Sequence, residues 1–189
     1  ILQCLLRRRL GLPILPDNEV CEGRRCGAQL DELGHHRCAC MKTGRVHGRH
    51  AAAIHPWKQV LEEAGYRIRI ERLLRDTNVR TSPQDQRRMD IVAAPGARSV
   101  GARRGMPLFC DVTICSTHTQ HGGAQPGAAN HDGATIGRAV TRKRRRYRDV
   151  VASAHASLVV LGCEAYGRWS TDAISLMREL AYSRYGPAT

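Results

Sequence analysis

The chain has 189 residues, of which 42% are hydrophobic and 25% are charged, a composition typical of a folded globular protein and not of a disordered one. The 30 Lys and Arg residues outnumber the 17 Asp and Glu residues, which gives a formal net charge of +13 and a pI near 10.1. Most of the basic residues are arginine, whose planar guanidinium forms bidentate hydrogen bonds with phosphate. We therefore expect nucleic acid as the partner, ahead of a merely solubilising role for this charge.

The composition also excludes some classes of protein. No apolar run approaches the roughly 20 residues of a membrane-spanning helix, and the opening segment places its basic run after its apolar residues, unlike a signal peptide. We therefore expect a soluble intracellular protein with no membrane partner. Because the chain begins with Ile1 instead of methionine, it is interpreted as part of a longer polyprotein. Its 8 cysteines favour metal binding over disulfides, since intracellular thiols stay reduced.

The sequence divides into three zones. Residues 1–20 form a basic and apolar lead-in, interpreted as a linker or the tail of a preceding domain. Residues 21–50 are rich in Cys, His and Gly and lack periodic hydrophobicity, so a metal ion is the expected source of their order. Residues 51–189 carry regular hydrophobic patterns and are predicted to form the main domain.

The cysteine-rich zone has the spacing of a zinc knuckle. Zinc is commonly bound by a tight cysteine turn and by a second His/Cys pair a short distance along the chain. The predicted ligands are Cys21, Cys26, His36 and Cys40. The members of the second pair are separated by three residues, which places both on one face of a helical turn. His35 and Cys38 remain alternative ligands, and packing of unligated thiols explains such a cluster less well.

The main domain is predicted to contain a helix, three strands, a helix, a strand and a helix. The helices cover residues 51–65, 134–154 and 170–186, and the strands cover residues 66–74, 88–93, 107–115 and 157–164. The apolar residues on one face of the first helix are Ile54, Trp57, Val60, Leu61 and Ala64. In the last helix, Ser170 is the predicted N-cap and Gly186 the predicted stop. This order predicts an α/β domain with a mixed sheet flanked by helices.

Two of the predicted strands contain an aspartate within an apolar run. Alternation predicts that Asp90 faces away from Met89 and Ile91, and that Asp111 shares a face with Phe109. A buried carboxylate is costly unless it is paired or bound to a metal. Two carboxylates on adjacent strands can share Mg²⁺, which binds through one or two carboxylates, waters and phosphate oxygens. Pairing of each aspartate with a nearby arginine is the alternative.

The predicted helix 134–154 contains a basic run. Lys143 and Tyr147 are four residues apart and therefore lie on the same face. The arginines around them, predicted to contact nucleic acid, are Arg142, Arg144, Arg145 and Arg146. A run of this kind is most often a solvated face. Next to two carboxylates, however, a lysine suits phosphodiester hydrolysis, in which it orients water and stabilises the developing charge.

Together, these features resemble the C-terminal region of site-specific non-LTR retrotransposons. In those polyproteins a zinc knuckle and a restriction-like endonuclease of the PD-(D/E)xK fold follow the reverse transcriptase. The resemblance begins at about Cys21 and rests on the knuckle, a helix ending in EAG, a strand with an aspartate, the DVT strand, and the K and Y of the basic helix. It implies a nuclear endonuclease with structural Zn²⁺ and catalytic Mg²⁺, which nicks target DNA and frees a 3′-hydroxyl to prime reverse transcription. The RNA of the element is a second implied partner.

The resemblance also implies roles for particular residues. Those that match the family's catalytic positions are Asp90, Asp111, Lys143 and Tyr147. Met89 stands where the motif has proline, and Thr113 stands where it has lysine, so the catalytic cation is expected from Lys143. Glu62 and Glu63 are candidates for a third acidic ligand, but a role on the helix surface is favoured for both. The alternative function is a catalytically inactive zinc-knuckle nucleic-acid-binding fragment of a decayed element.

Overall fold

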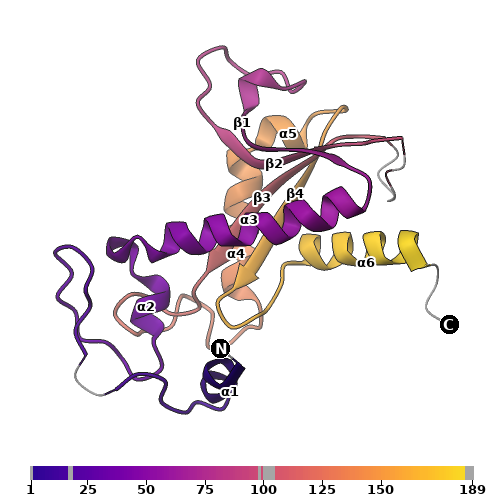
Figure 1. The fold of residues 1–189 in the computed structure, drawn as a ribbon. Coiled ribbons are helices and arrows are strands. Elements are labelled where there is room, and N and C mark those ends of the chain that lie inside the picture. Colours follow the sequence, from indigo (N-terminus) through magenta and orange to yellow (C-terminus); the bar gives the residue numbers. More distant parts are fainter. Residues whose placement is uncertain (1, 17–18, 98, 100–104, 186–189) are drawn as a thin grey trace.

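The computed structural model describes residues 2–16, 19–97, 99 and 105–185 (Figure 1). The helices are α1 (Leu2–Arg9), α2 (His35–Ala39), α3 (Arg45–Glu63), α4 (Ala134–Arg146), α5 (Arg148–Val151) and α6 (Thr171–Tyr185), with 3₁₀ turns η1 (Met41–Thr43) and η2 (Leu74–Asp76). The strands are β1 (Arg67–Leu73), β2 (Arg88–Ala94), β3 (Leu108–Cys115) and β4 (Ser157–Glu164). Gly186, the predicted end of the last helix, lies outside the described residues. In the part of the chain that is described, no helix is both long and apolar enough to cross a bilayer.

The strands form one mixed sheet in the order β1-β2-β3-β4. β1, β2 and β3 pair antiparallel, and β3 pairs parallel with β4. Parallel neighbours need a crossover connection, and α4 with α5 supplies it between β3 and β4. The predicted α/β domain with a mixed sheet is therefore confirmed, and each predicted strand agrees with the structure to within one residue at either end.

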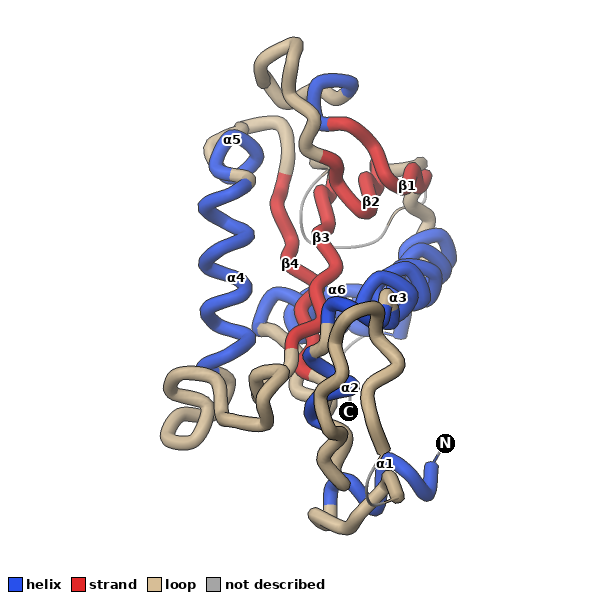
Figure 2. The backbone as a smooth tube through the Cα atoms, turned by 90° about the vertical axis from the view of Figure 1, so that its left-hand side faces the viewer, coloured by secondary structure: helices blue, strands red, loops and turns tan. Residues whose placement is uncertain are grey.

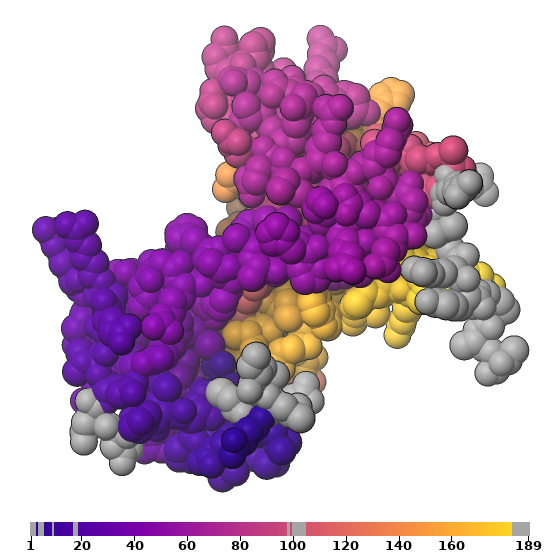
Figure 3. All heavy atoms as spheres, in the orientation of Figure 1, coloured from indigo at the N-terminus to yellow at the C-terminus, as the bar shows by residue number. Residues whose placement is uncertain are grey.

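Helices cover both faces of this sheet. Figure 2 shows α4 and α5 on one side of the strands and α3 with α6 on the other. The core on the α3 side includes Leu61, Ile91 and Leu176, whereas the core on the α4 side includes Phe109 and Val160. The N-terminal region with α1 and α2 protrudes beyond one end of α3 (Figures 1 and 3).

The first long helix differs from its prediction in two respects. α3 begins at Arg45, six residues earlier than predicted, after Gly44 with a left-handed φ of 69°. It therefore crosses the predicted boundary between the knuckle and the main domain. Trp57 and Leu61 are buried as predicted, but Val60 is 42% exposed, because it lies about 100° around the helix from Leu61.

The predicted helix 134–154 is interrupted at Tyr147, which has φ −109° and ψ 35°. Its continuation would need the N–H of Val150 to donate to the carbonyl of Arg146. Instead, Val150 donates to Tyr147, and the Arg87 guanidinium donates to the Arg146 carbonyl. This tertiary hydrogen bond replaces the helical one and separates α4 from α5.

Candidate functional site

The predicted zinc knuckle is built from a short hairpin followed by α2. The hairpin is closed by the bridge between Val20 and Gln29 and turns through Gly27 at φ 60°. Asp31 then caps α2, since its two carboxylate oxygens accept the backbone N–H groups of His35 and His36 at 2.7 and 2.8 Å. Burial alone would raise the pKa of Asp31, but these two hydrogen bonds outweigh it and lower the pKa.

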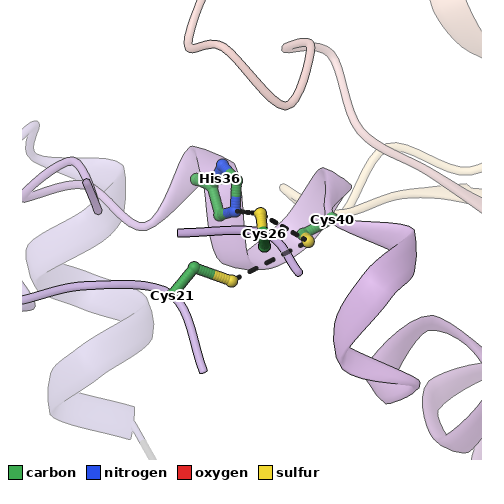
Figure 4. A group of neighbouring side chains, drawn as sticks. All are labelled: Cys21, Cys26, His36 and Cys40. Carbon is green, nitrogen blue, oxygen red and sulfur yellow. Dashed lines mark hydrogen bonds between the residues drawn. The ribbon is translucent and has the colours of Figure 1, made fainter. Parts of the chain in front are cut away.

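The four predicted ligands converge on one point (Figure 4). Their ligand atoms all lie within 4.8 Å of one another. The Sγ of Cys40 lies 3.8 Å from that of Cys21 and 3.7 Å from that of Cys26, and Cys26 Sγ lies 3.4 Å from His36 Nε2. Tetrahedral zinc with Zn–S bonds of about 2.3 Å separates its sulfur ligands by about 3.8 Å. The cluster could therefore bind zinc.

Contacts around the cluster prepare its ligand atoms for a metal. His36 Nδ1 lies 2.5 Å from the Gln120 carbonyl, an acceptor that fixes the tautomer in which Nε2 keeps its lone pair. Burial raises the pKa of the Cys21 thiol, and the backbone N–H of Gly23, which donates to Cys21 Sγ at 3.4 Å, partly opposes this effect. The backbone N–H of Ala28 is the main cause that lowers the pKa of the Cys26 thiol to about 7. A thiolate, the form that zinc needs, is thus favoured at Cys26.

The two alternative ligands lie outside this cluster. Cys38 Sγ accepts a hydrogen bond from the Arg8 guanidinium at 2.9 Å. The His35 ring stacks on His118, with 3.7 Å between ring centroids and 14° between planes, and hydrogen bonds to the Tyr166 hydroxyl. The structure thus selects His36 and Cys40, because α2 turns these two side chains toward the hairpin.

The second site lies where β2 and β3 stop pairing. Their register ends at Ile91 and Cys110, although β3 continues to Cys115. Beyond this point the backbone N–H of Val112 donates to Asp90 Oδ2 at 2.7 Å. The Asp90 carboxylate therefore replaces a backbone acceptor between the two strands.

The simple alternation predicted for β2 is wrong at this position. Met89 belongs to the core on the α4 side, whereas Ile91 belongs to the core on the α3 side. In β1, Glu71 lies between the partners of these two residues and has a left-handed φ of 51°, which rotates the strand. Local rotation of both strands turns Asp90 toward β3, an effect that period-two patterning cannot predict.

Each carboxylate has a basic partner. Asp111 is 1% exposed, and Lys143 Nζ from α4 lies 2.7 Å from its Oδ1 and 2.9 Å from its Oδ2. His50 Nε2 from α3 lies 3.1 Å from Asp90 Oδ2. We call these four residues, Asp90, Asp111, Lys143 and His50, the acidic fork. Sequence reasoning missed His50, since it lies in the Cys/His-rich zone and only α3 brings it to β2.

The electrostatics of the acidic fork show that its charges interact. Burial raises the pKa of Asp111, the Lys143 charge opposes this effect, and the Asp90 charge adds to it. The hydrogen bond to Asp90 raises the pKa of His50, and the Asp111 charge contributes in the same direction. Asp90 therefore lies close enough to Asp111 for its charge to disfavour the ionised form of Asp111.

Tyr147 is buried beside the acidic fork. Its hydroxyl donates to the Arg88 carbonyl at 3.0 Å, which ties the end of α4 to the start of β2. Burial, followed by the Asp111 charge, raises the pKa of Tyr147. The phenol thus stays protonated at neutral pH and remains a hydrogen-bond donor.

The other predicted residues occupy different surroundings. Arg142, Arg145 and Arg146 are exposed on α4, whereas Arg144 pairs with both oxygens of Asp172 at 2.8 and 2.9 Å. The two glutamates considered as a third acidic ligand bond to residues of their own helix, Glu62 to Lys58 at 2.9 Å and Glu63 to Gln59 at 3.0 Å. These contacts agree with the favoured surface role.

Comparison with known proteins provides no assignment. The chain matches no model of a protein family and no curated protein. The evidence for its function therefore lies in the Cys3His cluster of Cys21, Cys26, His36 and Cys40 and in the acidic fork.

Proposed function

We propose that this chain is the Mg²⁺-dependent DNA endonuclease domain of a non-LTR retrotransposon polyprotein, with a zinc knuckle that has a structural role. The observation that carries the proposal is that Asp111 pairs with Lys143 and feels the charge of Asp90, whose carboxylate accepts the neighbouring backbone N–H of Val112 at the end of the β2–β3 pairing. The element order of a helix, three strands, a helix and a strand agrees with the restriction-like fold that the sequence resemblance implies. The protein would act on chromosomal DNA in the nucleus.

The donor set of the acidic fork suits a hard divalent cation. Asp90 and Asp111 would hold Mg²⁺, which prefers carboxylate oxygens. Asp111 Oδ1 lies 2.7 Å from Lys143 Nζ, outside hydrogen-bond geometry, and a carboxylate oxygen has a second lone pair that can bind another ligand. When bound, the ion would polarise a phosphoryl oxygen of the substrate.

The reaction would be hydrolysis of one phosphodiester bond. The water oxygen bonds to phosphorus, the bond from phosphorus to the 3′ oxygen breaks, and that oxygen takes a proton to become a 3′-hydroxyl. Lys143 would place its ammonium beside the phosphoryl oxygens and stabilise their increasing negative charge. Tyr147 and His50 would hold Asp90 in place through β2 and α3.

A plasmid-nicking assay with added Mg²⁺ tests the proposal. We expect Asp111→Asn and Lys143→Met each to lower the nicking rate by about 100-fold or more, since each removes a charge that acts in the transition state. DNA polymerase should extend the nicked product directly, because the nick carries a 3′-hydroxyl.

Matched control variants identify contamination and nonspecific effects. Asp132→Asn changes a carboxylate that is 91% exposed, and Lys58→Met changes a lysine on the surface of α3. Both should nick like the native chain. Equal nicking by all of these proteins would reject the acidic fork as the catalytic site.

The second candidate function is a non-catalytic nucleic-acid-binding fragment of a decayed element. It is favoured by the contacts of the two carboxylates, since Lys143 and His50 already occupy Asp111 and Asp90, as a purely structural arrangement would. It predicts salt-dependent DNA or RNA binding and no nicking at any Mg²⁺ concentration.

A further inference from the structure

One half of the α4-side face of the sheet is not covered by α4 and α5. These helices lie beside β4 and β3, and β1 is the opposite edge of the sheet (Figure 2). A groove of about 330 Å³ runs along β1 at this uncovered edge. Residues that line it include Arg67, Arg69, Arg72, Val92, Ala94 and Pro107. We call it the β1 groove.

Three arginines of β1 line this groove together. Arg67 and Arg69 share a face by strand alternation. Arg72 would point to the other face, but the left-handed backbone of Glu71 intervenes, so Arg72 also lines the groove. The segment from β1 to β2 projects from the body of the molecule, on the side opposite the N-terminal region with α1 and α2 (Figures 1 and 3).

These guanidinium groups have no carboxylate partner among the described residues. Arg67 donates to the Pro95 carbonyl at 3.5 Å and Arg72 to the Asp76 carbonyl at 3.4 Å. The Asp76 carboxylate also lies at the groove but pairs with Arg75, 3.8 Å away. Without acidic partners these arginines leave the groove with unneutralised positive charge, which an anion can bind. Their planar donors suit phosphate.

The geometry favours a double-stranded partner. The residues that line the groove include no aromatic side chain, so single-strand binding by base stacking has no platform here. Residues i and i+2 of a strand lie about 6.8 Å apart, which is about twice the axial rise per phosphate of one DNA strand. Arg67 and Arg69 are therefore spaced to contact phosphates along a duplex.

The groove lies on the same side of the sheet as the acidic fork. Val92 in the groove packs with the α4-side core, so the groove opens on the sheet face that carries Asp111. Arg72 pairs in register with Met89, the residue before Asp90. One end of the groove is therefore level with the acidic fork, two strands away from β3.

We propose that the β1 groove binds the phosphate backbone of the DNA duplex beside the phosphodiester that is cleaved. The inference rests on the proposed endonuclease function for the position of the cut. Binding of the duplex itself does not depend on catalysis.

Salt-dependent DNA binding by the full chain, measured without Mg²⁺ by fluorescence anisotropy, tests this proposal. Each phosphate contact contributes about 0.9 to the slope of log affinity against log salt concentration. The triple variant Arg67→Ala, Arg69→Ala, Arg72→Ala should lower this slope by about 2 to 3 and weaken binding at least about tenfold at 0.15 M salt. The corresponding triple substitution to lysine keeps the charge and should retain most of the slope, which separates loss of charge from misfolding.

A control variant removes the same net charge elsewhere. Its substitutions are Arg45→Ala, Lys58→Ala and Arg178→Ala. Arg45 pairs with Glu22, Lys58 pairs with Glu62, and Arg178 is exposed on α6. This variant should retain the native slope. An equal loss of slope in the control and in the groove variant would overturn the groove as a specific site, and so would an unchanged slope in the groove variant.

Two further outcomes test the partner of the groove and distinguish failure of the groove proposal from failure of the proposed catalytic function. If an RNA duplex competes better than DNA, the assignment of DNA as the partner is wrong. If the native chain never nicks but the groove variant still loses slope, the proposed catalytic function fails and the groove stands.

Discussion

At the scale of single residues, the buried ion pair of Asp111 and Lys143 dominates the energetics of the acidic fork. The Asp111 side chain is 1% exposed and that of Lys143 is 21% exposed, so the aspartate cannot gain hydration if its partner is removed. Loss of one partner of a buried pair is usually far more costly than loss of both. Substitutions in this pair therefore test the buried ion pair through the free energy of unfolding, without any assumption about catalysis.

We expect Lys143→Met to lower the free energy of unfolding by about 3 kcal/mol near neutral pH, because Asp111 then remains as an uncompensated buried charge. Burial already raises the pKa of Asp111 in the native chain. A group with a raised folded-state pKa contributes its stability at low pH and loses it as pH rises through that pKa. The loss in Lys143→Met should thus be small near pH 4 and should increase as pH rises, as urea denaturation will measure.

The double variant Asp111→Asn, Lys143→Met provides the check on this interpretation. It removes both charges and should recover most of the lost stability and lose the pH dependence. A double variant as unstable as Lys143→Met would show that packing of the lysine stem, and not the buried charge, causes the loss.

At the scale of elements, Ser170 joins α6 to β4. Its hydroxyl accepts the N–H of Ala173 at 3.2 Å, as the predicted N-cap should. The same oxygen accepts the N–H of Gly162 at 3.1 Å and donates to the Val160 carbonyl at 2.7 Å. Since Ser170 is 2% exposed, water cannot replace these bonds. One side chain therefore caps a helix and fixes it against the end of the sheet.

Ser170→Ala should lower the free energy of unfolding by about 2 kcal/mol, because it removes the cap and leaves buried polar groups of β4 without a partner. Thermal and urea denaturation measure this change. Thr171→Ala, an exposed position one residue later, is the matched control and should change stability by less than about 0.5 kcal/mol. Similar losses for the two variants would contradict a specific capping role of Ser170, because alanine has the higher helix propensity at both positions.

At the scale of the whole molecule, the knuckle is attached to the main domain by several contacts from its own ligands and their neighbours. His36 bonds to the Gln120 carbonyl in the loop after β3, and His35 stacks on His118 of the same loop. Arg49, next to His50 on α3, donates to the Cys38 carbonyl at 2.6 Å. Zinc binding should therefore order more than the hairpin and α2.

Zinc analysis of the native chain should give about one ion per chain, as a single four-ligand site requires. Cys26→Ser should lose this ion, whereas Cys38→Ser should retain it, because Cys38 lies outside the cluster and bonds to Arg8. Loss of zinc frees His36 from its position, so hydrogen exchange should increase at the backbone of residues 117–125. Retention of zinc by Cys26→Ser, or its loss in Cys38→Ser, would contradict the assigned ligand set.

The sequence by itself determined the features that depend on local spacing. Strand boundaries, the mixed α/β order and the Ser170 cap follow from hydrophobic periodicity and capping chemistry, which act within a few residues. The Cys21/Cys26 and His36/Cys40 pairs were also recognisable, because the spacing of each pair already constrains its geometry.

The tertiary structure alone decided which groups meet across the chain. Sequence left His35 and Cys38 open as zinc ligands, and contacts with Arg8, His118 and Tyr166 excluded them from the cluster. The contact of His50 with Asp90 joins residues 40 positions apart. The break of the helix at Tyr147 depends on the Arg87 guanidinium, which lies just before β2 and donates to the Arg146 carbonyl. No periodicity encodes such contacts, because they arise from packing of separate elements and from local backbone rotation.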